Sequence, residues 1–339
     1  MAQAAICAGC RAYFGYPITP QNEILEYMAA RMPAMGGAFV QAESEIAAIN
    51  MCYGASAAGV RTMTSSSGPG ISLKMEGISF LAGADLPCVI VNVARGGPGL
   101  GNIAPAQGDY FQATKGGGHG DYHMIVLGPA TIAEAIELVM LGFDLADRYR
   151  VPVMILSDGM LGQMMEPVVL PEPIDPTSLP AKPWALTGAS GRSPNVITSY
   201  FIDPRDLSQI NTKRQSRYRK IEENEVRYRE TETSDATIVI VAYGMVARIA
   251  RTAVRMARNQ GIKAGLVQPI TLWPFPYAPL RELSSRVKTI LTVEMSSGQM
   301  VEDVRLAVAD RAETPFYGEL GGLVPTPKDI LREVKRNVS

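Results

Sequence analysis

The sequence lacks the features of a nucleic-acid-binding or membrane protein. Its 339 residues carry a formal net charge of -1, and no run of basic residues alternates with aromatic ones, so a nucleic-acid surface is not expected. No apolar run reaches the length of a membrane span, and the N-terminus lacks the basic start and cleavage site of a signal peptide. These absences predict a cytoplasmic protein with neither kind of partner.

Metal ligands are also scarce, since the chain has two histidines and four cysteines. Cys7 and Cys10 form a CxxC pair, whereas Cys52 and Cys88 stand apart, so no second pair completes a zinc or iron–sulfur site. We therefore expect structural cysteines, and no metal or cluster bound by this chain alone.

Phosphate-binding fingerprints are missing too. The loop Ser65–Gly70 enters a helix, but it has neither the lysine of a P-loop nor the spacing of a dinucleotide fingerprint. Residues Gly97–Gly101 open no helix with an acid about 20 residues further on, which argues against a nucleotide-dependent dehydrogenase. The chain also has no GDG…N pattern for a magnesium-bound diphosphate.

What the chain does have is a repeated strand, helix, strand rhythm. Its hydrophobic fraction of 47%, charged fraction of 19% and 32 glycines describe a well-packed α/β protein, long enough for two domains. The runs Pro87–Ala94 and Val151–Ser157 are nearly continuous in apolar residues, which is typical of buried parallel strands. Residues 1–165 are therefore predicted to form a doubly wound parallel sheet.

The remainder divides into two parts. Residues 166–234 begin as a proline-rich linker and continue as a densely charged stretch, which predicts an exposed helix. That helix could present a solvated salt-bridge face or could be a docking arm for a partner subunit. From residue 235 to 339 the strand and helix rhythm restarts, and this predicts a second, smaller α/β domain.

Glu45 is the residue around which these elements are organised. It opens the predicted helix Ser44–Ala58, and the side chains at helical spacing below it are small or apolar: Ala48, Ile49, Cys52 and Ser56. A lone carboxylate on such a face costs several kcal/mol without a partner, and this stretch has no lysine or arginine nearby. Glu45 is either a helix N-terminal acid favoured by the macrodipole or a carboxylate kept in a pocket for a cofactor's ring nitrogen.

Two other polar residues follow predicted strands. Thr19 stands between Pro17 and Pro20 after a short strand, and Arg95 ends the strand Pro87–Ala94. Ligands of open α/β sheets bind at the carboxyl ends of the strands, so both residues are candidates for binding an anion. Thr19 could instead cap the next helix with Pro20 at its first position, and Arg95 could be a solvated exit residue.

The loop that follows Arg95 is long and rich in glycine. It contains Gly97 and Gly99 and continues to Gly116–Gly120, which is long enough for an active-site lid. His119 lies in this loop and His123 follows it. They are the only candidates for base catalysis by histidine, although surface or loop-packing roles are the simpler interpretation.

Together these motifs resemble a known family. The segments Tyr16-Pro17-Ile18-Thr19-Pro20, Ser44–Ala48, Thr64–Gly70 and Val93-Ala94-Arg95 are similar to the alpha subunit of 2-oxoacid:ferredoxin oxidoreductases, especially the branch that acts on 2-oxoisovalerate and 2-oxoglutarate. The resemblance covers essentially the whole chain. The motif around Thr19 is specific, whereas the loop near Gly68 is shared more widely among thiamine diphosphate enzymes.

The resemblance implies a fold and a set of site residues. Residues 1–165 would be a doubly wound thiamine-diphosphate pyrimidine-type domain, followed by a smaller α/β domain like the transketolase C-terminal domain. Glu45 would be the catalytic acid that pairs with the aminopyrimidine ring. The implied cofactor-binding residues are Pro17, Glu45, Ser67 and Gly68. The implied substrate-binding residues are Ile18, Thr19 and Arg95.

It also implies an activity and partners. The enzyme would convert a 2-oxo acid and coenzyme A to an acyl-CoA and pass electrons to ferredoxin, in either direction. A beta subunit would hold the diphosphate, its Mg²⁺ and an iron–sulfur cluster, beside gamma and ferredoxin-like delta subunits. Pyruvate, branched-chain, aromatic and 2-oxoglutarate substrates all stay open. The alternatives are a non-catalytic assembly subunit and a self-contained transketolase-like transferase, which the missing diphosphate motif disfavours.

Overall fold

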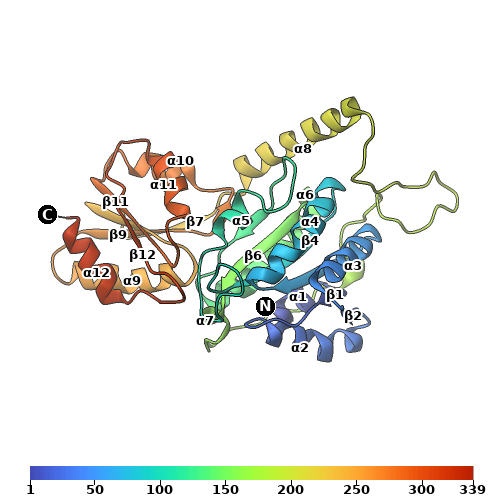
Figure 1. Ribbon diagram of the computed structural model, residues 1–339, viewed down its shortest axis with the longest axis horizontal. Helices are drawn as coiled ribbons and strands as arrows, with labels where there is room; N and C mark the ends of the chain where they lie inside the picture. The colour runs from blue at the N-terminus through green and yellow to red at the C-terminus, as the bar shows by residue number, and fades with distance from the viewer. Residues whose placement is uncertain (339) are drawn as a thin grey trace.

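A computed structural model describes residues 1–338 and contains two sheets that lie side by side along the long axis of the molecule (Figure 1). The first has seven strands in the order β10-β5-β6-β4-β3-β1-β2. All neighbouring strands are parallel except β10 and β5. Its strands are β1 (Ala12–Gly15), β2 (Ala38–Gln41), β3 (Thr62–Ser66), β4 (Cys88–Ala94), β5 (Ile125–Leu127), β6 (Pro152–Asp158) and β10 (Thr271–Trp273).

Helices cover this sheet, and the predicted doubly wound α/β fold is confirmed. The central strands β4 and β6 are buried along their whole length, as their apolar runs predict. The helices of this unit are α1 (Ala2–Cys7), α2 (Asn22–Arg31), α3 (Glu45–Ala57), α4 (Gly68–Gly83), α5 (Tyr110–Thr114), α6 (Ile132–Tyr149) and α7 (Gly159–Gly162), with the short 3-10 helix η1 (Pro33–Met35) after α2.

The second sheet has five strands in the order β12-β11-β8-β9-β7, with β7 antiparallel to β9. Its strands are β7 (Tyr228–Thr231), β8 (Ile238–Val241), β9 (Ala264–Pro269), β11 (Thr289–Glu294) and β12 (Phe316–Gly318). The helices here are α9 (Gly244–Arg258), α10 (Tyr277–Leu283), α11 (Met300–Val308) and α12 (Pro327–Arg336). This is the smaller α/β unit that the second rhythm predicts.

The proline-rich segment projects away from both sheets in Figure 1 and holds only the 3-10 helix η2 (Pro176–Ser178) before α8 (Pro204–Asn224). The charge pattern predicts α8 to be exposed, but one side of it is buried. Arg214 and Arg217 both pair with Asp85, at 3.1 Å and 2.9 Å, and Tyr218 is 3% exposed. The helix therefore packs on the first unit of its own chain.

The two units are joined by more than the covalent chain. Strand β10 follows the second unit's β9 in sequence but belongs to the first sheet, so the two sheets are not built from two uninterrupted stretches of the chain. The loop after β4 is bonded to the second unit. Gln107 N donates to Met295 O at 2.8 Å, and Tyr110 Oη donates to Asp303 at 2.7 Å.

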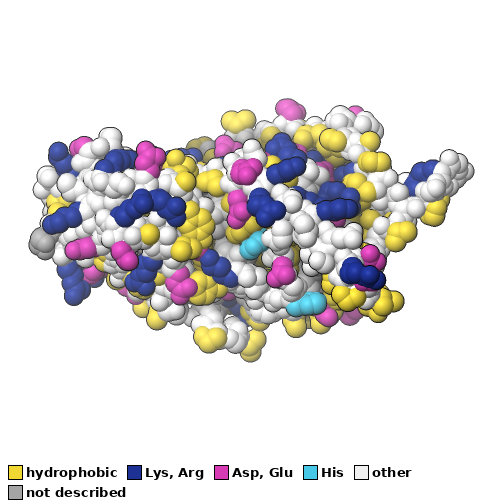
Figure 2. Space-filling view, turned by 90° about the horizontal axis from the view of Figure 1, so that it is seen from above, with side chains coloured by type: hydrophobic (Ala, Val, Ile, Leu, Met, Phe, Trp, Pro, Cys, Tyr) yellow, Lys and Arg dark blue, Asp and Glu magenta, His cyan; other side chains and the backbone are white. Residues whose placement is uncertain are grey.

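The surface agrees with the near-neutral composition. Figure 2 shows basic and acidic side chains interspersed over the visible face. Within residues 1–338, no helix combines the length and the apolarity needed to cross a bilayer. All four cysteines are buried and free: Cys7, Cys10, Cys52 and Cys88.

Candidate active site at the carboxyl edge of the seven-stranded sheet

Glu45 is the first residue of α3 and is 6% exposed. The preceding Ser44 caps the helix, because its Oγ accepts a hydrogen bond from Ala47 N at 3.2 Å. Ser44 thus satisfies one of the free backbone donors at the start of α3 without using the Glu45 carboxylate. Among the described residues, none donates a hydrogen bond to that carboxylate, which leaves it open to a ligand.

Glycine makes room for Glu45 on the neighbouring helix. A Cβ at Gly70, near the start of α4, would lie 2.6 Å from Glu45 Oε1 and closer still to Ser66 Oγ. The hydroxyls of Ser66 and Ser67 are buried and have no hydrogen-bond partner within the described chain. A larger residue at Gly70 would therefore fill the space that the acid and these hydroxyls share.

A cation that the local sequence did not reveal lies beside Glu45. Lys74 of α4 is fully buried, and its Nζ donates to the backbone oxygen of Glu45 at 3.4 Å. Burial lowers the pKa of Lys74, while the nearby Cys52 and Glu45 oppose that shift. This contact is with the Glu45 backbone and comes from a residue distant in sequence, so the α3 stretch alone does not reveal it.

Arg95 lies at the end of β4 and is held by backbone carbonyls. Its Nη1 donates to Thr19 O at 2.9 Å and its Nη2 to Leu100 O at 3.0 Å. Its Nε is buried without a partner among the described residues. Arg95 is therefore half-buried and fixed in place, with a donor left for an anion. It is not a freely solvated residue at the exit of the strand.

The remaining sequence-predicted residues differ in their burial and in the neighbours that they contact. Thr19 is exposed beside Arg95, and its alternative role as a helix cap is wrong, because Gln21 is the N-cap of α2. Gly68 lies against Arg95, since a Cβ there would be 3.5 Å from Arg95 Cγ. Pro17 is exposed and Ile18 is half-buried in the turn that precedes Thr19.

A cavity of about 660 Å³ opens between the two units beside Arg95. Gly97 and Gly99 line it, and the second unit supplies a wall that includes Ser296 and Gln299. His119 does not line this cavity and is exposed on the loop, so the structure does not bring it to Glu45. The lid role of this loop stays a prediction.

Asp109 also lines the 660 Å³ cavity. Burial raises the pKa of Asp109, and Asn92 Nδ2, which donates to its carboxylate at 2.9 Å, acts in the opposite direction. The sequence motifs predict no role for Asp109. The one feature that could have indicated it is its position on the glycine-rich loop downstream of Arg95.

A second cavity, of about 420 Å³, lies on the other side of Thr19. Ser157 and Asp158, at the end of β6, form part of its wall, and Ser157 Oγ is buried without a partner in the described chain. Burial raises the pKa of Asp158 to about 6. No lysine, arginine or histidine lines this cavity, whereas Glu23 and Asp158 do.

Unpartnered polar atoms gather at this edge of the sheet. A buried polar atom without a hydrogen bond costs about 1–3 kcal/mol, so native proteins rarely leave several together unless a ligand satisfies them. The atoms concerned belong to β3, β4, β6 and the residues that follow them: Thr64 Oγ1, Ser66 Oγ, Ser67 Oγ, Asn92 Oδ1, Arg95 Nε and Ser157 Oγ. This arrangement suits a polar ligand.

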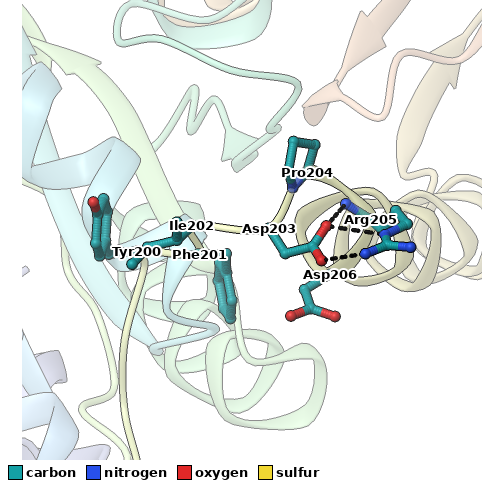
Figure 3. Close-up of a pocket in the computed structure, with 7 residues that line it drawn as sticks. All are labelled: Tyr200, Phe201, Ile202, Asp203, Pro204, Arg205 and Asp206. Carbon is teal, nitrogen blue, oxygen red and sulfur yellow. Dashed lines mark hydrogen bonds and ion pairs between the residues drawn. The ribbon is translucent and has the colours of Figure 1, made fainter.

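Another cavity, of about 930 Å³, lies where the proline-rich segment enters α8 (Figure 3). Its polar groups bond one another, because Asp203 accepts from Arg205 N at 2.8 Å and pairs with the Arg205 guanidinium. It is an open hollow at a helix start and brings together none of the residues described above.

The fold and this edge define an α/β protein of the thiamine-diphosphate-binding class. Residues 3–238 match the family described as "Pyruvate flavodoxin/ferredoxin oxidoreductase, thiamine diP-bdg", and residues 236–330 match "Pyruvate:ferredoxin oxidoreductase core domain II". The chain belongs to the 2-oxoacid:ferredoxin oxidoreductase family and corresponds to its alpha subunit. The resemblance noted in the sequence is confirmed, as is the oxidoreductase class.

Curated relatives match almost end to end. The chain is 53% identical over 331 residues to ketoisovalerate oxidoreductase subunit VorB of Methanothermobacter thermautotrophicus, covering 98% of this chain and 94% of the relative. It is 36% identical over 361 residues to 2-oxoglutarate synthase subunit KorA of Methanothermobacter marburgensis, covering 98% and 96%.

Solved structures share the fold. The 2-oxoglutarate:ferredoxin oxidoreductase from Magnetococcus marinus, with 2-oxoglutarate, coenzyme A and succinyl-CoA bound, matches with a TM-score of 0.87 at 29% identity. That match covers 100% of this chain but only 64% of the other. A split-gene transketolase in an inactive beta4 tetramer matches at a TM-score of 0.60 and 16% identity, which shows a likeness of fold alone, over 99% of this chain and 94% of the other.

Proposed function

We propose that Glu45 binds the aminopyrimidine end of thiamine diphosphate in an enzyme that oxidatively decarboxylates a 2-oxo acid to an acyl-CoA. The observation that carries the proposal is the state of the Glu45 carboxylate. It is buried, receives no hydrogen bond from the described chain, and faces the space that Gly70 leaves beside Ser66. A ring nitrogen that donates a hydrogen bond would satisfy this acid, so the residues present fit the cofactor.

The chain's own residues then have distinct tasks. When bound, thiamine diphosphate supplies the electron sink for decarboxylation. Glu45 holds a proton at the aminopyrimidine ring, in surroundings where low polarity strengthens the hydrogen bond. Arg95 binds the carboxylate of the 2-oxo acid through donors that Thr19 O and Leu100 O hold in direction. Because the carbonyls fix the guanidinium before binding, little ordering is needed when substrate arrives.

A branched-chain 2-oxo acid is the substrate class that the cavities favour. The 420 Å³ cavity beside Thr19 has the acidic side chains Glu23 and Asp158 in its wall, and the amino group of Met1 is the cationic group among its lining residues. A second carboxylate, as in 2-oxoglutarate, would meet these acids, and burial lowers the pKa of the Met1 amino group and so weakens its positive charge. An aliphatic side chain fits against Val93, Ile132 and Leu161. The relative at 53% identity is a ketoisovalerate enzyme subunit, whereas the 2-oxoglutarate relative is at 36%.

Other subunits complete the proposal. A beta subunit would hold the diphosphate with its Mg²⁺ and an iron–sulfur cluster, and gamma and ferredoxin-like delta subunits would carry electrons to ferredoxin. The relatives are themselves described as subunits, which supports a multi-subunit enzyme. A non-catalytic assembly role is the alternative, but it gives no reason for an open, buried acid and an arginine with an open donor at the same edge of the sheet.

The test is to purify the chain with its co-purifying subunits and assay a panel of 2-oxo acids with coenzyme A and a dye acceptor. We expect turnover that requires thiamine diphosphate and favours 2-oxoisovalerate over 2-oxoglutarate. A preparation that contains bound thiamine diphosphate but turns over no 2-oxo acid would refute the proposal. Preference for 2-oxoglutarate would overturn only the assignment of the substrate side chain.

A further inference from the structure

Lys74 is a buried cation for which the reaction described above has no role. It is 0% exposed, and within residues 1–338 its hydrogen bond is the 3.4 Å contact from Nζ to the backbone oxygen of Glu45. A buried ammonium is costly unless a charge compensates it, and one near a helix N-terminus is also opposed by the helix dipole. Something nearby must offset both costs.

The packing of α3 on α4 fixes where this charge can lie. Gly70, Lys74 and Gly77 follow one another at helical spacing on α4, and Glu45, Ile49 and Cys52 do so on α3. A Cβ at Gly77 would overlap Ile49, so the helices are in close contact there. The Lys74 side chain is enclosed between them, with its ammonium at the first turn of α3.

Three groups act on the Lys74 charge from the packed elements. They are the Cys52 thiol of α3, which acts most strongly, the Glu45 carboxylate of α3, and the Cys88 thiol of β4. Against the effect of burial, hydrogen bonding to Cys88 and the nearby Lys74 charge lower the pKa of Cys52, so this thiol competes with Glu45 as the counter-charge. Glu45 is the group whose ordinary pKa lies well below neutral pH, so its carboxylate is the stronger candidate.

We propose that Lys74 is a positioning residue for Glu45: its ammonium offsets the charge of the buried Glu45 carboxylate across the contact of α3 with α4, and its hydrogen bond to the Glu45 carbonyl holds the first turn of α3. The benefit to catalysis rests on the function proposed above. The charge coupling does not, because it is a property of this chain alone.

A double-mutant cycle on the full chain measures the coupling. Glu45→Gln and Lys74→Met each leave one buried charge uncompensated, and each should lower the thermal midpoint by roughly 5 °C or more. The double variant removes both charges and should recover at least half of that loss. Lys220→Met, on the exposed face of α8, is the matched control and should shift the midpoint little.

A second cycle separates Glu45 from the thiols. Cys52→Ala combined with Lys74→Met should show additive losses. A lysine with only a packing role would give additive losses with Glu45 as well.

Each outcome of these experiments either supports or overturns the inference. Additive losses for Glu45 and Lys74, or coupling to Cys52 instead, would overturn the inference. If Lys74→Met does not fold, folding of the double variant supports the inference, and its failure to fold counts against it. Normal turnover of Glu45→Gln in the assembled enzyme would refute the proposed function while leaving the measured coupling intact.

Discussion

The two units each bury a glutamate where a strand meets a helix, but they treat it differently. Glu294 ends β11, is 0% exposed, and accepts hydrogen bonds from the backbone of α11. Met300 N and Val301 N donate at 2.9 Å and 3.0 Å. Glu45 begins α3, leaves helix capping to Ser44, and receives no donor from the described residues.

We propose that this difference distinguishes a structural acid from a functional one. Burial raises the pKa of Glu294, and donors from the start of α11 oppose that shift by holding the charged form. Glu294 therefore finds its hydrogen-bond donors within the chain itself. The environment of Glu45 is incomplete, because none of residues 1–338 donates a hydrogen bond to its carboxylate oxygens, although Lys74 lies beside it. Burial alone therefore does not mark a site, whereas a buried acid with unmet hydrogen-bonding capacity does.

The largest effect we expect is the loss of turnover on substituting Glu45. Glu45→Gln should lower turnover of the assembled enzyme by at least roughly 10²-fold, because a positioned proton carrier is lost. Steady-state assays at saturating 2-oxo acid measure it. The Glu45→Gln, Lys74→Met double variant is the control, since it should regain stability and remain inactive. Near-normal turnover in either variant would contradict the role of Glu45.

Glu294 should show the opposite behaviour, with a loss of stability. Glu294→Ala leaves several donors at the start of α11 without an acceptor and should lower the free energy of unfolding by about 2–3 kcal/mol. Denaturant titration of the full chain measures it. Glu294→Gln keeps one acceptor oxygen and should lose less. An alanine variant as stable as the parent would remove the distinction between the two acids.

Arg95 extends the comparison of the two acids to a hydrogen-bond donor, because its Nε has no partner within residues 1–338. Arg95→Ala should raise KM for the 2-oxo acid roughly 10- to 100-fold with a smaller loss of kcat, because a charge-assisted bond to the substrate carboxylate is lost. Arg95→Lys should recover only part of the affinity, since an ammonium cannot reproduce the bonds to Thr19 O and Leu100 O. An unchanged KM in the alanine variant would reassign Arg95 to loop structure.

Much of the fold could be predicted because its signals are local. The apolar runs of β4 and β6 give their position and burial directly, and the start of α3 follows from Ser44 and Glu45. Strands β10 and β12 have three residues each and were not predicted. Such short segments carry no periodicity, and their pairing depends on sheet edges that are distant in sequence.

The residues of the proposed site also differ in whether local sequence signals indicate them. Thr19, Glu45 and Arg95 could be proposed as site residues because strand ends and helix starts are visible in sequence, and their roles stay predictions. Lys74 could not, because helix-to-helix packing brings it to Glu45 across 29 residues. The helix-cap interpretation of Thr19 failed because Gln21, 1% exposed and bonded to Tyr16 O, takes that position. Contacts between elements, rather than residue types, limited the prediction.

The smallest effect we expect is on the stability of the chain when Asp158, a third buried acid, is substituted. Asp158 ends β6 as Glu294 ends β11, and its Oδ1 accepts from Met160 N at 2.9 Å and Leu161 N at 3.0 Å. Yet burial outweighs these bonds and raises its pKa from 3.8 to about 6. The folded chain therefore holds this proton more tightly than the unfolded chain does.

The sign of the pH dependence follows from that difference. A raised carboxyl pKa favours the folded state fully below pH 4, and this contribution is lost as pH rises through 6. Asp158→Asn removes the titration and keeps an acceptor oxygen. Its stability relative to the parent should therefore rise by up to about 2 kcal/mol between pH 4 and pH 7. Denaturant titrations at both pH values measure it, with the exposed Asp121→Asn as control. A stability difference that does not change with pH would mean that Asp158, like Glu294, is fully satisfied by its own helix.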